Sequence, residues 1–169
     1  CRACMVEIEG ERVLAASCIR KPAAGMKVNA SNHRAKTAQQ MVFELLVSDQ
    51  PERKTEAHDP VSKFWGWADK MGVETGRFPE RAKNPAPDRS HLAMAVNLDA
   101  CIHCNLCVRA CREVQVNDVI GMAGRGHNEK IVFDFDDPMG QSTCVACGEC
   151  VQACPTGALM PAPLLDANN

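Results

Sequence analysis

Residues 144–154 read CVACGECVQAC and residues 101–111 read CIHCNLCVRAC, so the spacing C-x2-C-x2-C-x3-C occurs twice in one chain. These two stretches hold eight of the eleven cysteines. The second copy is followed by Pro155 and the first by Arg112. Thiols at such short intervals are typical of metal-binding loops rather than of a disulfide framework.

The repeated spacing predicts two [4Fe–4S] clusters. Three cysteines in a short loop can hold three corners of an iron–sulfur cube, and the fourth, about one helical turn further on, points elsewhere. In two-cluster ferredoxins this fourth cysteine binds the other cluster. We therefore expect a first set, which is Cys101, Cys104, Cys107 and Cys154, and a second set, which is Cys144, Cys147, Cys150 and Cys111. Zinc is the alternative, but three evenly spaced cysteines plus a fourth, found twice, exceed what tetrahedral zinc uses.

A third group of cysteines, Cys1, Cys4 and Cys18, has the spacing C-x2-C-x13-C. Three thiolates make an incomplete site, and a fourth ligand upstream would complete a [2Fe–2S] centre. The chain starts at Cys1 rather than at methionine, so we expect its true start to be missing. The alternative is that Cys18 is only a small buried residue.

Composition narrows the remaining possibilities. The net charge is −2, which gives no sign of a nucleic-acid partner, and no apolar run approaches the roughly 18 residues of a membrane span. Five Phe, two Trp and no Tyr leave little aromatic area to bury, so bound metal is expected to help hold the fold together. The odd, clustered cysteines and the lack of a visible signal peptide favour a reducing, cytoplasmic setting.

The first half of the chain predicts a small sheet and helices. Alternation around Glu9-Gly10 predicts a hairpin, and residues 25–30 a further strand. A helix is expected over residues 32–48, capped by Ser31, with an apolar face made of Ala35, Ala38, Met41, Val42, Leu45 and Leu46. A second helix is expected to start at Asp59-Pro60, with a stripe of Val61, Phe64, Trp65 and Ala68. Trp65 and Trp67 are interpreted as packing residues.

The second half predicts a strand over 93–98, a glycine-rich connection over 121–127, and a strand with a turn over 131–138. Residues 76–90, rich in proline and charge, are expected to be a linker. His103 is expected to face solvent. We divide the chain into a partial [2Fe–2S] domain with a trailing helix (1–48), a helical and linker segment (49–90), and a two-cluster domain (91–169).

The residues also resemble a known family. CRACMVEIEG, at residues 1–10, resembles the N-terminal [2Fe–2S] domain shared by the large iron–sulfur subunit of complex I, [FeFe] hydrogenases and NAD-linked formate dehydrogenases. Residues 94–127 and 131–162 are similar to the α subunit of cytoplasmic molybdenum- or tungsten-dependent formate dehydrogenases. The resemblance implies an α+β fold: a truncated β-grasp [2Fe–2S] ferredoxin-like domain, a helical linker and a 2[4Fe–4S] ferredoxin-like domain.

One departure from the family concerns an additional cluster. Many relatives hold it by one histidine and three cysteines just after the helix placed at 32–48. In this chain Gln50 stands about where the histidine would be, and no cysteine follows until Cys101. The resemblance therefore implies that this cluster is absent, which weakens the complex I interpretation most.

The function implied by the resemblance is an electron relay. Formate would be oxidised at a molybdenum or tungsten bis-pyranopterin guanine dinucleotide in a catalytic domain after residue 169, and electrons would reach flavin- and NAD-binding diaphorase-type subunits. No catalytic residue of that domain lies in this chain, so whether the chain is itself an enzyme stays open. The rivals are a hydrogenase or complex I-type relay, a standalone ferredoxin, and a zinc-stabilised interaction module. Arg109 and Arg112 flank Cys111, and their positive charge is expected to favour the reduced state of the second cluster.

Overall fold

The computed structural model describes residues 2–79 and 85–166 and divides into two units. The first unit comprises residues 1–48 and 66–79, and the second comprises 49–65 and 80–169. None of the helices in the described part of the chain is long and apolar enough to cross a membrane.

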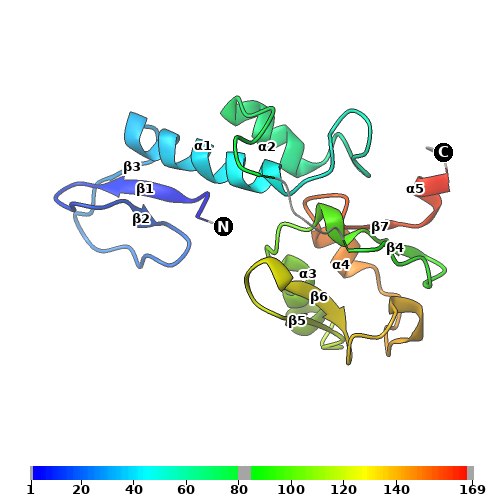
Figure 1. The fold of residues 1–169 in the computed structure, drawn as a ribbon. Coiled ribbons are helices and arrows are strands. Elements are labelled where there is room, and N and C mark those ends of the chain that lie inside the picture. Colours follow the sequence, from blue (N-terminus) through cyan, green and yellow to red (C-terminus); the bar gives the residue numbers. More distant parts are fainter. Residues whose placement is uncertain (1, 80–84, 167–169) are drawn as a thin grey trace. The chain divides into compact units, whose positions relative to one another are not determined.

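The first unit contains a three-stranded antiparallel sheet in the order β2-β1-β3 (Figure 1). Its strands are β1 (Met5–Ile8), β2 (Ala15–Ala16) and β3 (Val28–Asn29). Met5 pairs with Ala16, and Glu7 pairs with Asn29. The predicted hairpin and the predicted third strand are both confirmed, although β2 is shorter than the alternating pattern.

Helix α1 (His33–Ser48) confirms the predicted helix, but its cap and its buried face differ from the prediction. The side chain of Asn32, not of Ser31, accepts the N–H of Ala35, at 2.8 Å. The buried residues are Ala35, Phe43, Val47 and Ser48. Met41 and Leu45, predicted to be buried, are exposed. The covered face is a row of residues four positions apart: Ala35, Gln39, Phe43 and Val47. The side-chain amide of Gln39 donates a hydrogen bond to the carbonyl of Met5 in β1.

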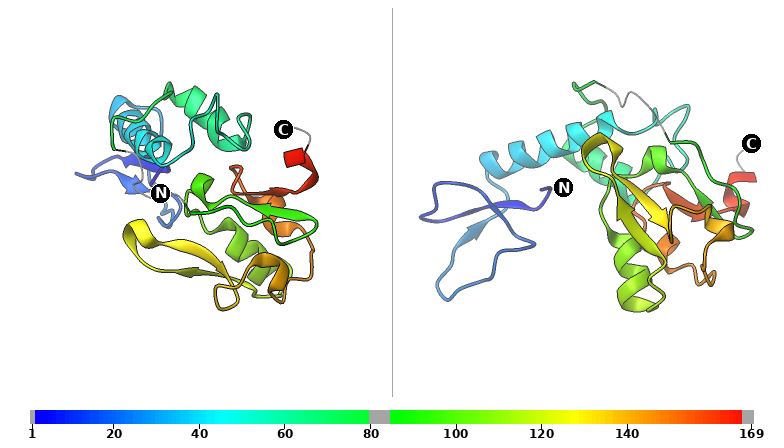
Figure 2. Two further views of the ribbon diagram at one scale, coloured as in Figure 1. Left: turned by 45° about the vertical axis from the view of Figure 1, so that its right-hand side comes forward. Right: turned by 60° about the horizontal axis from the view of Figure 1, so that its bottom comes forward.

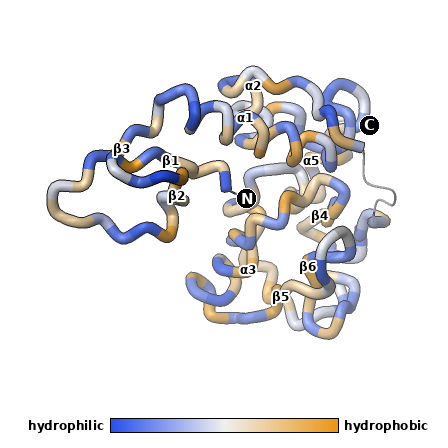
Figure 3. Tube along the Cα trace, turned by 60° about the vertical axis from the view of Figure 1, so that its left-hand side comes forward, coloured by the Kyte–Doolittle hydropathy of each residue, from blue (hydrophilic) through white to orange (hydrophobic). Residues whose placement is uncertain are grey.

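Helix α2 (Lys63–Met71) begins later than predicted. The carboxylate of Asp59 accepts the N–H of Val61 in a turn before the helix, and Val61 is exposed rather than part of the buried stripe. Trp65 is buried as predicted, whereas the prediction for Trp67 is wrong. Trp67 is half exposed, and the ammonium group of Lys70 lies 4.4 Å from its ring. The mixed colours along α1 and α2 in Figure 3 match helices with one covered face.

The second unit contains two pairs of antiparallel strands and several short helices. One pair joins β4 (Met94–Val96) to β7 (Leu159–Pro161), and the other joins β5 (Ile120–Ala123) to β6 (Lys130–Phe133). The helices are α3 (Leu106–Arg109), continued by a π-helical turn (Ala110–Val114), α4 (Glu149–Ala153) and α5 (Pro163–Asp166). Single 3₁₀ turns cover Leu98–Ala100, Gly126–Asn128 and Met139–Gln141.

This topology interleaves the two cysteine motifs. The first motif lies between β4 and β5, and the second lies between β6 and β7. Because β4 pairs with β7 and β5 with β6, each strand pair joins the entrance of one motif to the exit of the other. Helices α3 and α4 contact one another between the strand pairs (Figures 1 and 2).

Several predictions for this unit are confirmed and one is wrong. Strand β4 confirms the prediction for 93–98, and β6 with the turn after it confirms that for 131–138. The prediction of a connection over 121–127 is wrong in its first half, since Gly121–Ala123 belong to β5. In the predicted linker, residues 80–84 lie outside the described residues. Asp88 exchanges backbone hydrogen bonds with Val96 at 2.9 and 3.1 Å, which extends the β4–β7 pair.

Candidate iron–sulfur centres

The two cysteine motifs share an unusual backbone conformation. In the first loop His103 and Asn105 have φ of 52° and 67°, and the equivalent residues of the second loop, Ala146 and Gly148, have φ of 58° and 79°. Left-handed backbone at a non-glycine residue costs on the order of 1 kcal/mol or more and is concentrated at functional sites. The shared conformation turns each loop around a centre, and α3 or α4 then begins.

The first set of cysteines lies around one pocket. Its cysteine lining is Cys101, Cys104, Cys107 and Cys154, so three residues of the first motif meet the fourth cysteine of the second. The space between the lining atoms is about 280 Å³, part of it open to solvent. Ile131, Pro155 and Leu159 contribute apolar wall.

The second set of cysteines lies around another pocket with the reverse arrangement. Its cysteine lining is Cys111, Cys144, Cys147 and Cys150, and the space between the atoms is about 300 Å³. The structure thus brings together both groups of four that the spacing predicts. His103 is half-buried rather than fully facing solvent.

The chemistry of the two pockets fits a polynuclear cationic centre. Burial, with a smaller contribution from the neighbouring Cys101 thiolate, raises the pKa of Cys107 to about 12. Burial acts likewise on Cys150, whose pKa also rises to about 12, with Cys144 as the largest charge contribution. Four thiolates can share such a pocket only when bound metal neutralises them. The donor set is therefore suited to iron–sulfur clusters, whose ligands are cysteine thiolates.

Backbone N–H groups point at several of these sulfurs. Val119 donates to Cys111 Sγ at 3.4 Å, and Ala146 donates to Cys144 Sγ at 3.4 Å. Such bonds stabilise negative charge on cluster sulfur and so favour reduction.

In the part of the chain that the structure describes, no group of three or more His, Cys, Asp or Glu side chains is spaced to hold a single metal ion.

The two pockets differ in exposure. Cys101 and Cys107 of the first set are buried and its other members are half-buried, whereas Cys147 of the second set is exposed. Val145, beside Cys144, is 62% exposed. Among the eight cysteines of the two sets, Cys147 is therefore the one most accessible to water.

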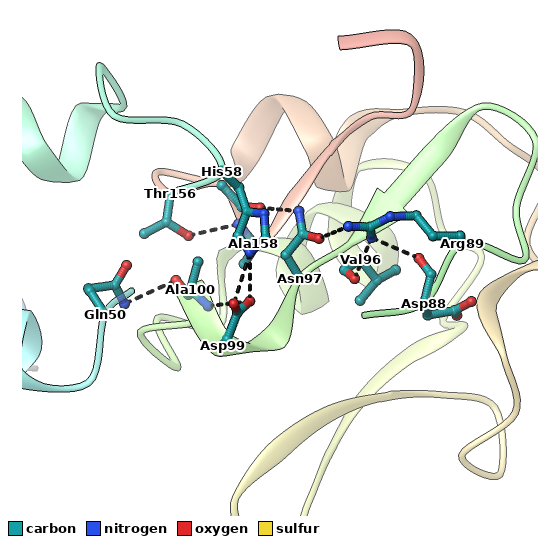
Figure 4. Close-up of polar contacts among 11 residues, drawn as sticks. Gln50, His58, Asp88, Arg89, Val96, Asn97, Asp99, Ala100, Thr156 and Ala158 are labelled. Atoms are coloured by element: carbon teal, nitrogen blue, oxygen red, sulfur yellow. Dashed lines mark hydrogen bonds and ion pairs between the residues drawn. The ribbon is translucent and has the colours of Figure 1, made fainter. Parts of the chain in front are cut away.

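A polar network joins the chain just before Cys101 to the chain just after Cys154 (Figure 4). Asn97, which is fully buried, accepts a bond from Arg89 at 2.6 Å and donates to the carbonyl of Gly157 at 2.8 Å. The Nε2 atom of His58 lies 2.9 and 3.0 Å from the two carboxylate oxygens of Asp99. Burial opposes ionisation of Asp99 and is the largest single influence, but the hydrogen bond and charge interaction with His58 and the N–H of Ala100 together outweigh it and hold the pKa of Asp99 below its usual value. Sequence reasoning missed this network, since none of these residues belongs to a motif.

The first unit brings together part of the third cysteine group. Cys4 Sγ and Cys18 Sγ lie 3.3 Å apart without a disulfide, and Cys1 lies outside the described residues. The two thiols are within hydrogen-bonding distance, and they are closer than the roughly 3.8 Å that separates two sulfurs on one tetrahedral metal ion. The backbone N–H of Cys18 lowers the pKa of Cys4. Cys18 is exposed, so the alternative of a buried packing residue is wrong.

Gln50, where the resemblance places a lost histidine ligand, has a structural contact. Its amide donates to the carbonyl of Ala100 at 3.2 Å, directly before Cys101. The side chain therefore ties residues 49–65 to the first cysteine loop.

The two arginines beside Cys111 are paired with carboxylates. Arg109 bonds Glu113 at 2.9 Å, and Arg112 bonds Asp118 at 2.7 Å, both on the surface. We therefore expect Arg112→Ala to move the potential of the second cluster by less than 59 mV, the tenfold change in a one-electron equilibrium. Asp118→Ala, which removes the carboxylate and leaves Arg112 charged, should raise that potential more. A redox titration in which Arg112→Ala lowers the potential by more than 59 mV would contradict this.

The raised thiol pKa values predict how the metal-free protein responds to alkali. Thiols of the unfolded chain titrate near pH 8.5, while Cys107 and Cys150 in the folded metal-free chain titrate at about 12. Their contribution to stability is complete below about pH 8.5 and is lost as the pH rises toward 12. We expect the Tm of the metal-free chain to fall between pH 8 and 10. The iron-loaded chain, whose thiols are already deprotonated, is the control, and an equal fall in both forms would refute the explanation.

Comparison with known proteins identifies both kinds of centre. Residues 100–158 match the model of a 4Fe-4S dicluster domain, and residues 1–33 match that of a 2Fe-2S iron-sulfur cluster binding domain. The fold is similar to a crystal structure of an NAD+-reducing [NiFe]-hydrogenase in the H2-reduced state, with a TM-score of 0.86 and 22% identity. The match covers 96% of this chain and 69% of that one.

Curated relatives come from three groups of oxidoreductases. A subunit of the NADP-reducing hydrogenase of Solidesulfovibrio fructosivorans is 30% identical over 95% of this chain and 28% of its own length. A putative formate dehydrogenase of Staphylococcus haemolyticus is 29% identical over 95% of this chain and 16% of its own length. A subunit of the NADH-quinone oxidoreductase of Rhizobium meliloti is 30% identical over 96% of this chain and 19% of its own length. This chain thus spans less than a third of the length of these relatives.

Proposed function

We propose that this chain is the relay of a formate dehydrogenase α subunit. The premise is that the chain is an iron–sulfur electron-transfer region homologous to those of hydrogenase, formate dehydrogenase and NADH-quinone oxidoreductase subunits. Its electrons would come from a molybdenum or tungsten pterin site in the same protein and leave to a flavin- and NAD-binding partner in the cytoplasm. The observation that carries the relay is the gathering of both four-cysteine sets around separate pockets of one unit.

The residues of this chain would hold three centres. The first and second sets would each bind one [4Fe–4S] cluster, and Cys4 and Cys18, with Cys1 and a ligand upstream, would bind a [2Fe–2S] cluster on a truncated β-grasp domain. Each bound cluster supplies one-electron chemistry. The protein's own contribution is to fix the sulfurs, to donate N–H groups to them and to limit the access of water.

The experiment compares electron donors on the full-length protein with its partner subunits. Formate, hydrogen and NADH are added separately under anaerobic conditions, and cluster reduction is followed by freeze-quench electron paramagnetic resonance. Formate is expected to reduce the clusters within the turnover time. Cys104→Ala should abolish formate-dependent NAD+ reduction while NADH-dependent dye reduction at the flavin subunit persists.

A hydrogenase relay is the second candidate, because the NADP-reducing hydrogenase subunit matches this chain as well as the formate dehydrogenases do. Rapid reduction by hydrogen and none by formate would replace the formate proposal with this one. A zinc-stabilised module would contain zinc, lack the brown iron–sulfur absorption and respond to no donor.

A further inference from the structure

Residues 49–65, which we name the strap, precede the two-cluster region in sequence but pack against it within the second unit. Gln50 donates to the carbonyl of Ala100 at 3.2 Å, and the N–H of Phe64 donates to the carbonyl of Pro155 at 2.9 Å. Ala100 directly precedes Cys101, and Pro155 directly follows Cys154. The strap therefore bonds to both chain segments that bring the first set of cysteines together.

The middle of the strap is fastened by His58. Its Nε2 atom lies 2.9 and 3.0 Å from the carboxylate oxygens of Asp99, and both side chains are about four-fifths buried, with exposed fractions of 20% and 22% (Figure 4). Charge-assisted bonds at this depth are stronger than exposed ones. Asp99 also accepts the N–H of Ala100 at 3.0 Å, so the contact with His58 reaches the backbone that carries Cys101.

The strap lies very close to the chain after Cys154. A Cβ atom built on Gly157 would lie 2.8 Å from the Cβ of His58 and 2.9 Å from the nitrogen of Asp59. Only glycine permits that approach. The strap is itself braced, since the guanidinium of Arg53 bonds the carbonyl of Pro60 at 3.0 Å and lies 5.2 Å from the buried ring of Trp65.

The strap also forms a wall beside a ligand of the first set. A surface hollow is lined by His58, Pro60 and Val61 from the strap and by Cys154, Thr156 and Leu164 from the chain opposite. Displacing His58 would widen this hollow and admit water to Cys154. The contacts described above all fall beside the first set, while Cys147 of the second set is exposed.

We propose that the strap holds the first cluster's ligands in place and shields Cys154 from water, with His58 as the positioning residue, so that it sets the potential and the lifetime of the first cluster alone. The inference rests on the proposed function only in requiring that the first set binds a cluster. Water stabilises the more negative reduced state, so an opened strap should raise the potential of that cluster.

The test uses His58→Ala and Asp99→Ala in the full-length protein, in a Cys147→Ala background that retains only the first cluster, and again with both clusters present. The two variants remove the same contact, but only Asp99→Ala also removes a carboxylate. If His58 positions the strap, both His58→Ala and Asp99→Ala should raise the reduction potential of the first cluster by at least 59 mV. This shift is a tenfold change in its one-electron equilibrium. Both should also hasten its bleaching in air about tenfold. The second cluster's potential should stay unchanged.

The matched control is His91→Ala, whose imidazole accepts the N–H of Ala93 at 3.1 Å and makes no contact with Asp99 that the structure gives. It should change neither potential. His58→Gln, which keeps a donor, should restore part of the wild-type potential. A raised potential in Asp99→Ala with no shift in His58→Ala would replace positioning by simple charge tuning, and equal shifts in both clusters or none at all would overturn the inference. A wild-type protein that binds clusters but ignores formate would refute the proposed function and leave this result intact.

Discussion

Cys104→Ala and Cys154→Ala are expected to remove the same cluster, although these cysteines lie in different motifs. Each single variant should keep about four of the roughly eight irons of the two-cluster region. The double variant Cys104→Ala/Cys154→Ala should keep the same four. Cys147→Ala/Cys154→Ala should keep none, because it disables both sets.

This non-additive pattern follows from the strand pairing. Because β4 pairs with β7, the end of the second motif lies beside the loop of the first, and Cys154 lines the pocket of Cys101, Cys104 and Cys107. Cys111 lines the opposite pocket because β5 pairs with β6, which brings the end of the first motif beside the loop of the second. Iron and acid-labile sulfide are measured on anaerobically reconstituted chains.

The matched variant is Cys111→Ala, which should behave as the mirror image. The double variant Cys111→Ala/Cys147→Ala should keep the same four irons as either single variant. The double variant Cys104→Ala/Cys111→Ala should keep none. Loss of both clusters in Cys104→Ala/Cys154→Ala, with half retained in Cys147→Ala/Cys154→Ala, would mean that each motif keeps its own fourth cysteine. The assignment of the sets would then be wrong.

Asn97→Ala is expected to destabilise the second unit, although Asn97 is not a cysteine of either set. Asn97 is fully buried and bridges Arg89 and the carbonyl of Gly157. Truncation leaves the buried carbonyl of Gly157 without this bond, at about 1–3 kcal/mol, whereas exposed Arg89 keeps its bonds to the carbonyls of Asp88 and Val96. That cost corresponds to a fall in Tm of roughly 4–15 °C for a domain of this size. It is measured by thermal unfolding of the iron-loaded chain in an anaerobic cell.

The control for this substitution is Asn128→Ala, at an exposed position. Surface changes of this kind stay within about 0.5 kcal/mol. An Asn97 variant that melts within about 2 °C of the parent would show that the buried bridge contributes nothing to stability.

The cysteine sets could be predicted from the sequence because ligand spacing is a local property. Each loop needs two left-handed residues and a following helical turn, and a short segment of chain encodes both. The hairpin around Glu9-Gly10 and the bounds of α1 were predictable for the same reason, since alternation and helical period act over a few residues.

The contacts that brace the first pocket could not be predicted in this way. His58 and Asp99 are 41 residues apart, and Asn97 and Gly157 are 60 apart. No periodic pattern links such residues, and a lone histidine or asparagine has many uses. The face of α1 was misjudged because the sheet beside it, not the helix, decides which row is covered. Trp67 was misjudged because a tryptophan can also lie flat beneath a surface lysine.

The most direct test of the two-cluster assignment is Mössbauer spectroscopy of the chain reconstituted anaerobically with isotopically enriched iron. The expected spectrum assigns about eight irons to [4Fe–4S] centres, separate from any [2Fe–2S] component, and both tetranuclear centres become paramagnetic on reduction. A spectrum with iron only at isolated tetrahedral thiolate sites, or with about four tetranuclear irons in the unsubstituted chain, would contradict it.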